Sequence, residues 1–328
     1  MSRRPMPPPL SLPKPGLWRR TPPAIFPPIL GLFGLGLGWR EAAPAFGVPA
    51  AIGDMIVGAV ALLYLFALGA FLAKPLRRAG GLLEEMRVLP GRAGLAAASL
   101  SLMLLAASLA PLAPVLAQGL AALAFGVHVA LVVLLVYVLR AGPPEGRVVT
   151  PVFHLSFVGF IIGGVAANAL GLPEIARLLL WAMIVPAAVI WAISARQLLR
   201  QFPPAPLRPL LAIHLAPASL FTIVAQGAGL GGMATAFGAL AVVLAVALLA
   251  SGRWLTEAGF SELWGAFTFP LVAFATEMIL VSGGQGALGL IAGALLLAAS
   301  GVVPLIAYRI LKLWAQGTLA AKTNAAEA

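Results

Sequence analysis

Residues 263–312 read LWGAFTFPLVAFATEMILVSGGQGALGLIAGALLLAASGVVPLIAYRILK. Two apolar runs, Leu263–Val281 and Ala287–Ile310, flank the short uncharged segment Ser282–Gly286. Because a helix needs about 20 apolar residues to cross the hydrocarbon core of a bilayer, each run is long enough to span it. The stretch Ile291–Ser300 is continuously apolar, whereas strands of a membrane β-barrel alternate in polarity. The pattern therefore predicts a helical hairpin.

The composition of the whole chain is also typical of a membrane protein. Of its 328 residues, 61% are hydrophobic and 9% are charged, whereas soluble domains carry about 25% charged residues. Such a chain has too few charges to cover a water-facing surface and too much apolar surface to stay disordered. The absence of cysteine excludes disulfides, thiolate metal sites and cysteine nucleophiles.

Similar apolar runs recur along the chain and predict an all-α polytopic membrane protein. Residues 21–318 are expected to form the transmembrane domain, between solvated and largely disordered tails at 1–20 and 319–328. The ten predicted spans are Ala24–Trp39, Ile52–Ala73, Ala93–Leu112, Leu116–Leu139, Pro151–Leu170, Ile175–Ile193, Leu210–Gly227, Ala234–Ala250, Leu263–Val281 and Ala287–Ile310.

The positive charges predict the orientation of these spans. Nineteen of the 21 Lys and Arg residues lie in the tails or in the loops after even-numbered spans, and two, Arg40 and Arg177, lie on the opposite side. Loops rich in Lys and Arg stay in the cytoplasm, so both termini are expected to be cytoplasmic. Membrane topology thus explains the net charge of +11 better than binding to nucleic acid does.

The loops and the composition of the spans indicate a repeat. Loops after odd spans are short and nearly uncharged, while those after even spans are longer and basic, so a helical hairpin is repeated five times. Odd spans collect small residues, which allow helices to approach closely, and prolines, which free carbonyl groups that lipid does not satisfy. We therefore expect five odd helices as an inner pore ring and five even helices as an outer ring. The alternative is the general abundance of Gly and Pro in membrane helices.

Several motifs carry a resemblance to a known family. They are LWGAFTFP at Leu263–Pro270, TPVFHL at Thr150–Leu155 and LAPA at Leu215–Ala218, with weaker matches around Pro28–Leu37 and Tyr308–Leu313. In this order, they resemble the tellurite-resistance/dicarboxylate transporter family, which includes bacterial TehA-like channels and plant slow anion channels. The resemblance implies five hairpins, a homotrimer with one pore per subunit in the bacterial inner membrane, and transport of monovalent anions, sulfite, tellurite or C4-dicarboxylates.

The resemblance also implies a phenylalanine that blocks the pore from the ninth span, and by position this is Phe269. An apolar ring there would act as a dewetting gate; the other interpretation is a packed core aromatic. The residues expected to be associated with the pore are Pro270, Thr268, Pro217, Pro151, Pro28, Gly34, Ser156 and Ser219.

Glu277 lies about two turns beyond Phe269 in the same span. A carboxylate inside the membrane is a candidate for proton coupling. The blander interpretation, which we favour at this point, is that Glu277 snorkels outward or pairs with Arg40 or Arg177.

The three histidines give weaker indications of function than Phe269 and Glu277 do. His154 and His214 lie near the starts of two odd spans and form either a pH-sensitive vestibule or satisfied interfacial residues. His128 lies in an even span and is expected to pack or to contact another subunit.

No catalytic motif is present: HExxH, GxSxG and the P-loop are all missing, and no metal or cofactor is expected. No Lys or Arg lies mid-membrane, so hydroxyls, backbone N–H groups and helix ends would hold an anion weakly, which suits conduction. The sequence therefore predicts an anion channel or facilitative transporter. A proton-coupled C4-dicarboxylate carrier or a sulfite or tellurite exporter is the alternative, and a non-conducting membrane scaffold is a remote one.

Overall fold

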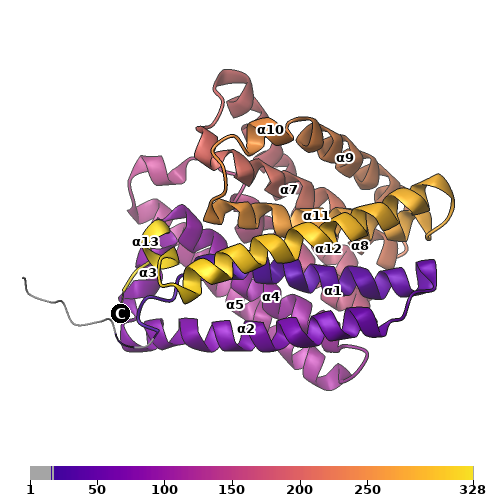
Figure 1. The fold of residues 1–328 in the computed structure, drawn as a ribbon, viewed down its shortest axis with the longest axis horizontal. Helices are drawn as coiled ribbons and strands as arrows, with labels where there is room; N and C mark the ends of the chain where they lie inside the picture. The colour runs from indigo at the N-terminus through magenta and orange to yellow at the C-terminus, as the bar shows by residue number, and fades with distance from the viewer. Residues whose placement is uncertain (1–15, 17, 328) are drawn as a thin grey trace, which may run out of the picture.

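The structure, a computed structural model, describes residue 16 and residues 18–327, which form helices and turns without a β-strand (Figure 1). Eight of these helices are long and apolar enough to cross a membrane, and the segment His154–Ala169 is apolar but shorter. The prediction of an all-α fold is confirmed. Helix α1 is not among the eight, since its four glycines, three prolines and the charged pair Arg40 and Glu41 lower its hydropathy.

The longer helices pair with their neighbours along the chain, as hairpins do. The first members of the pairs are α1 (Phe26–Phe46), α4 (Leu89–Leu109), α6 (Ile161–Ala169), α8 (Leu215–Gly227) and α11 (Gly265–Ser282). The second members are α2 (Ala51–Arg77), α5 (Pro114–Ala141), α7 (Pro173–Arg200), α9 (Gly231–Ala250) and α12 (Gly286–Ala315). Shorter elements are α3 (Gly80–Arg87), α10 (Gly252–Leu255), α13 (Leu319–Lys322), η1 (Pro23–Ile25), η2 (Pro144–Arg147), η3 (His154–Val158), η4 (Ala205–His214) and η5 (Glu262–Trp264).

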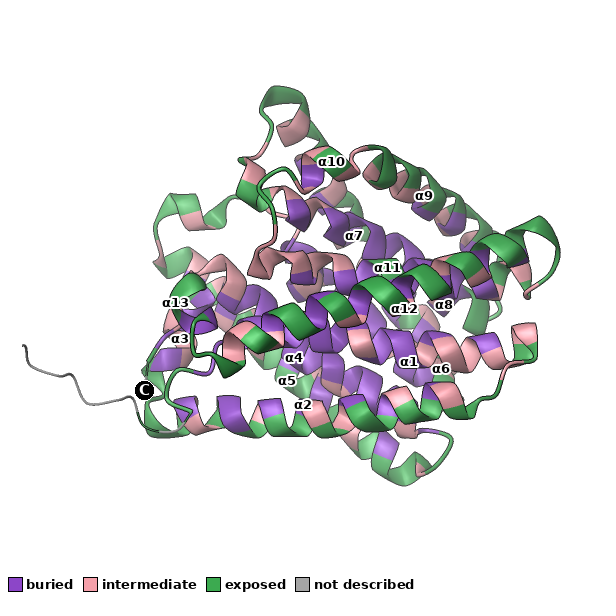
Figure 2. Ribbon diagram, in the orientation of Figure 1, coloured by how far each residue is buried: buried purple, intermediate pink, exposed green. Residues whose placement is uncertain are grey.

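The first and second members of the pairs differ in burial. In an 18-residue apolar window, 89% of α4, 78% of the segment Ala205–Gly227 and 61% of Glu262–Ser282 is buried, against 17–33% in the second members. Exposed residues run along α2 and α12, while α1 and α4 lie behind them and are mostly buried (Figure 2). Helices α1, α4, α6, α8 and α11 also contact one another in a closed cycle, and we call them the inner helices.

Glycines explain how closely α1 approaches its neighbours. A β-carbon added at Gly31 would lie 2.4 Å from Cβ of Thr268 in α11, and one added at Gly36 would lie 2.7 Å from Cγ2 of Val57 in α2. A larger residue at either position would overlap the facing helix. Small residues of α1 therefore place its backbone directly against both partners, as in other tightly packed membrane helices.

Four of the inner helices begin with turns that are not α-helical. Turn η1 precedes α1, the π-helical turn η3 precedes α6, η4 precedes α8, and η5 precedes α11, while α4 carries Pro90 in its first turn. Proline lacks the N–H group that an α-helical turn requires, and Pro23, Pro206 and Pro209 lie in these turns. We call the end of the bundle that contains these turns the entry end.

The C-terminal tail differs from the prediction. Residues 319–326 are not a disordered tail, because α13 and the residues after it pack on the entry end, with Leu319, Ala320, Thr323 and Ala326 buried. Lys74 at the end of α2 explains the docking, because its ammonium binds Glu85 and donates to the carbonyl of Ala326 (3.2 Å). The expectation for the N-terminal tail falls mostly on residues 1–15 and 17, which lie outside the described part of the chain.

Candidate functional site

A cavity lies among the inner helices, at their entry end. Its volume is about 70 Å³, several times the 10–15 Å³ that one water needs. Every inner helix or the turn before it contributes lining residues. They include Ala24, Pro27 and Leu30; Pro90, Ala93 and Leu100; His154, Leu155, Val158, Ile161 and Ile162; Leu210, Ile213, Ala216, Pro217 and Leu220; and Glu262, Leu263, Ala266, Phe269 and Pro270.

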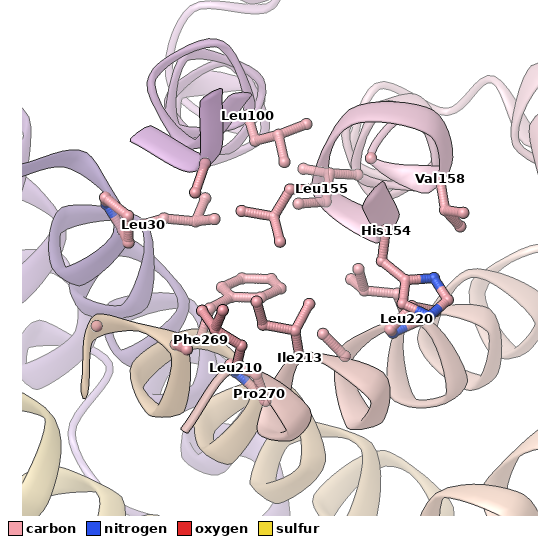
Figure 3. A pocket seen from close by; sticks show the side chains of 18 of the residues that line it. Leu30, Leu100, His154, Leu155, Val158, Leu210, Ile213, Leu220, Phe269 and Pro270 are labelled. Carbon is pink, nitrogen blue, oxygen red and sulfur yellow. The ribbon is translucent and has the colours of Figure 1, made fainter. Parts of the chain in front are cut away.

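The cavity wall is almost entirely apolar. Among its lining residues, His154 is the one with a polar side chain deep inside, and Glu262 is the one with a formal charge. Leucine and isoleucine side chains from four helices face one another across the space (Figure 3). Water in so apolar a space loses hydrogen bonds that the wall does not replace, so the cavity is prone to dewetting.

Phe269 of α11 projects into this cavity, and its ring faces Leu100 and Leu155 (Figure 3). The ring is 8% exposed, so it is closely surrounded. Gly34 of α1 provides room for the ring, since a β-carbon there would lie 3.3 Å from its Cδ2 and Cε2 atoms. A small residue on α1 and an aromatic residue on α11 are thus fitted to each other.

The residues on either side of Phe269 shape the backbone of α11. Pro270 lines the cavity and, having no N–H, leaves the carbonyl of Ala266 without its helical donor. Thr268 does not line the cavity, and its hydroxyl lies 2.7 Å from the carbonyl oxygen of Gly265 and 3.1 Å from that of Pro27. Thr268 therefore ties α11 to the start of α1 and does not offer its hydroxyl to the cavity.

The other residues expected near a pore occupy different places. Pro217 lines the cavity, and Pro28 packs against Gly265 where α1 meets α11. Pro151 precedes the π-helical turn η3. The Ser156 and Ser219 side chains are buried outside the cavity wall, at contacts with α5 and α11 respectively.

The structure brings His154 and His214 together, although 60 residues separate them in the sequence. His154 Nε2 lies 3.0 Å from His214 Nδ1, and both rings are buried. Trp191 of α7 donates its indole N–H to the His214 carbonyl (3.2 Å), and its ring centroid lies 5.5 Å from that of His154. We call the two histidines the histidine dyad.

His128 of α5 is fully buried within the subunit. Its Nε2 lies 3.0 Å from the Ser156 carbonyl oxygen, and its Nδ1 lies 2.7 Å from the Ser99 hydroxyl. Both ring nitrogens are therefore occupied, and the residue links α4, α5 and η3. Of the two expectations for His128, packing within the subunit fits this geometry, because the fully buried side chain has no surface left for contact with another subunit.

Glu277 does not snorkel, so the favoured interpretation from the sequence was wrong. The side chain is fully buried, and its carboxyl group faces α8 and α9, beside Ser219, Thr222 and Gly238. Neither carboxyl oxygen forms a regular hydrogen bond. The two proposed arginine partners are occupied elsewhere. Arg40 binds Asp54 (2.8 Å), and Arg177 binds Glu174 (2.6 Å).

A further buried polar cluster lies outside the cavity and was not expected from the sequence. Lys74 and Glu85 form an ion pair whose two side chains are each 1% exposed. Burial raises the pKa of the Glu85 carboxyl, against the opposing effect of the nearby Lys74 ammonium. Within the described residues, no group of three or more His, Asp or Glu side chains is arranged to hold a metal ion.

Comparison with known proteins identifies the family. The model of one family, described as voltage-dependent anion channel (SLAC1), matches residues 20–311. The chain belongs to the voltage-dependent anion channel family. This family covers the TehA-like and plant slow anion channel relatives, so the resemblance drawn from the sequence motifs is confirmed. No individual curated protein matches the chain.

Membership in the voltage-dependent anion channel family, together with the apolar helices, makes this chain a multi-pass membrane protein. The family consists of channels and transporters rather than enzymes, and its substrates are anions. The matched region begins just before η1 and ends in α12, so it contains all five inner helices and the whole cavity.

Proposed function

We propose that the chain is an anion channel or facilitative anion transporter in which anions pass between the five inner helices and Phe269 is the gate. In this proposal the ten paired helices all span the membrane, with the inner helices around the conduit and the others against lipid. The observation that supports the proposal most strongly is a cavity that all five inner helices line and that the Phe269 ring enters.

The apolar wall explains how such a gate would work. An ion loses several kcal/mol of hydration when it enters a space that offers no polar partners, and the Phe269 ring occupies part of that space. Rotation or removal of the ring would let water fill the space between Leu100 and Leu155, and hydrated anions would follow. No lysine or arginine lines the cavity, so an anion that enters is held weakly and can leave.

The arrangement of charges supports an entry end on the cytoplasmic side. Arg92, Arg147 and Arg208 all bind backbone carbonyls near this end, whereas Arg40 and Arg177 lie at the other. Positively charged loops are retained in the cytoplasm. We further propose, from the family resemblance, a homotrimer in the bacterial inner membrane with one conduit in each subunit.

Replacement of Phe269 by alanine tests the proposal. In planar bilayers containing chloride, Phe269→Ala is expected to conduct more current than the parent protein, because the ring no longer fills the cavity. Phe274→Ala is the matched control, since Phe274 lies on the same helix with the same 8% exposure and does not line the cavity. Equal currents from Phe269→Ala, Phe274→Ala and the parent would reject the gate.

A proton-coupled carrier of carboxylates, or an exporter of sulfite or tellurite, is a second candidate because of Glu277. A buried carboxyl group without a cationic partner is suited to binding a proton inside the membrane. Uptake of malate into liposomes that stops when the pH gradient is removed would favour the carrier. Absence of current and of uptake for every anion tested, in both the parent and Phe269→Ala, would favour a non-conducting scaffold.

A further inference from the structure

The histidine dyad has two ring nitrogens without partners. His154 Nδ1 and His214 Nε2 form no hydrogen bond with any described protein group, and the two side chains are 2% and 8% exposed. His154 lines the cavity, and His214 lies directly behind it. Buried polar atoms of folded proteins are nearly always hydrogen-bonded, so these two orphaned nitrogens, one on a residue of the cavity wall and one on the residue behind it, require an explanation.

We propose that the histidine dyad is an anion site that binds one proton together with one small monovalent anion. This inference rests on the proposed function, because it assumes that anions enter the cavity. In this proposal, protonation of the dyad gives the apolar wall its positive charge. The fraction of subunits that hold an anion in the conduit therefore depends on pH.

Counting protons shows why the dyad takes up one charge. Two neutral rings carry two N–H protons on four nitrogens. One proton bridges His154 Nε2 and His214 Nδ1, the second lies on one outer nitrogen, and the other outer nitrogen is bare. One added proton fills the bare nitrogen and leaves the bridge intact. A second added proton would place two N–H groups against each other across the 3.0 Å contact.

The surroundings disfavour a charge on the dyad alone and favour a neutral pair. An imidazolium ion in an apolar cavity loses its hydration, and so does an isolated anion. When both enter together, each compensates the charge of the other. The Trp191 ring lies beside the dyad, with its centroid 5.5 Å from that of His154 and the two ring planes tilted by 53°.

One other ionisable side chain of the neighbouring elements, Glu262 on η5, lines the same cavity. Because a carboxyl group is either neutral or negative, it cannot supply the positive charge that an anion requires. The other charged or titratable groups of the packed elements are bound elsewhere or face away from the dyad. Arg92 of α4 binds backbone carbonyls, Arg208 of η4 binds Glu257, and His128 of α5 is hydrogen-bonded at both ring nitrogens. Glu277 of α11 faces α9, and the α7 arginines Arg196 and Arg200 are exposed.

The charge and the volume of the site define the class of ligand. One positive charge neutralises one negative charge, so a halide or a small monovalent oxyanion fits. A C4-dicarboxylate would bring a second negative charge for which the cavity wall offers no partner. The cavity of about 70 Å³ also favours a small ion. The site therefore separates monovalent anions from dicarboxylates by charge.

Proton uptake on anion binding is the direct test. Chloride added to the purified protein in weakly buffered detergent solution is expected to cause uptake of up to one proton per subunit, whereas the larger anion gluconate at equal ionic strength is not. His154→Gln and His214→Gln are expected to abolish the uptake, because glutamine keeps a polar amide but does not titrate. Glu262→Gln, the other titratable residue of the cavity, is expected to retain it.

Measurements on the parent protein can overturn the proposal even if a variant fails to fold. Absence of chloride-dependent proton uptake in the parent overturns the proposal, and so does uptake that persists in both histidine variants or disappears in Glu262→Gln. Uptake that is lost in either histidine variant and kept in Glu262→Gln supports it.

A flux measurement separates this proposal from the proposed function. In the Phe269→Ala background, the apparent affinity for chloride is expected to rise about tenfold per unit decrease in pH while the dyad is mostly neutral, because one proton binds with each anion. A chloride affinity that does not depend on pH overturns the anion site at the dyad but leaves the proposed channel function intact. No current at any pH overturns the channel, and the proton-uptake measurement still decides whether the dyad binds chloride.

Discussion

Replacement of Lys74 by methionine is expected to destabilise the protein by about 3–5 kcal/mol, because it leaves one partner of a buried ion pair alone. The Lys74 ammonium binds Glu85 and also donates to the carbonyls of Thr21 (2.9 Å) and Ala326 (3.2 Å). The amide of Ala326 in turn donates to Glu85 Oε1 (3.0 Å). One substitution therefore removes the centre of a network that joins α2, α3, the N-terminal segment and the residues after α13.

Protonation of Glu85 limits the loss of unfolding free energy in Lys74→Met, and a double variant shows how much of that loss comes from the unpaired charge. Burial raises the pKa of the Glu85 carboxyl, and Lys74 opposes that effect, so the loss of Lys74 shifts this carboxyl towards its neutral form, which limits the penalty. The double variant Lys74→Met/Glu85→Leu removes both charges, leaving the backbone groups of Thr21 and Ala326 without partners. Each unsatisfied group costs about 1 kcal/mol or somewhat more, so we expect a loss of about 1–3 kcal/mol for the double variant.

Chemical unfolding in detergent micelles, followed by tryptophan fluorescence, measures these differences, and limited proteolysis reports whether residues 319–326 have detached. Arg78→Met is the matched control, because Arg78 forms an exposed ion pair with Glu84 (2.7 Å) next to the buried one. It is expected to cause no measurable change. The network would not have this role if Lys74→Met were as stable as the parent. It would also be refuted if the losses caused by Lys74→Met and by Glu85→Leu, each measured alone, added up to the loss in the double variant.

Two further predictions concern α1 and α11. Gly31→Ala is expected to destabilise the protein by about 1–3 kcal/mol through overpacking, because its β-carbon would lie 2.4 Å from Thr268 Cβ. The control is Gly58→Ala on the exposed face of α2, where an added β-carbon meets nothing within 4 Å. Equal melting temperatures of the two variants would contradict the close contact. Glu277→Gln is expected to leave chloride current unchanged and to preserve or raise the melting temperature, since an uncharged amide is easier to bury than a carboxylate; a loss of pH-driven uptake in this variant would instead favour the proton-coupled carrier.

The sequence predicts the outer part of the fold well, for a physical reason. Helices such as α5 and α9 expose most of their surface, and lipid requires that surface to be apolar, so hydropathy identifies them. Helix α1 contacts its neighbours instead, and can therefore carry four glycines and two charged residues. Those same glycines, together with the prolines of the odd spans, were the sequence signal for the helices that are now seen to be buried.

The candidate site is predictable in part. The motif around Phe269 indicated the residue, but its fit against Gly34 depends on how α1 and α11 cross, which no local pattern determines. The contact between His154 and His214 joins positions 60 residues apart. The Leu100 and Leu155 side chains that face the gate are ordinary leucines in a leucine-rich chain, so composition could not distinguish them.

Buried polar groups were the hardest to predict. Glu277 lies in an apolar run near the end of a span, where an outward-turned carboxylate is the simpler expectation. Lys74 follows the apolar run of the second span and resembles an ordinary basic loop residue. Its burial depends on residues 319–326, whose composition gives no sign that they dock.

The docking of those residues sets an order on biosynthesis. Glu85 and Ala326, which are hydrogen-bonded to each other, are 241 residues apart in the chain. At a translation rate of about 5–20 residues per second, the ribosome needs roughly 10–50 s to make the intervening sequence. For that interval the Lys74–Glu85 pair is in the nascent protein without its cover, while the hairpins are already being inserted. A quality-control protease that recognises the exposed Lys74–Glu85 pair would distinguish unfinished chains from those in which residues 319–326 have docked over it.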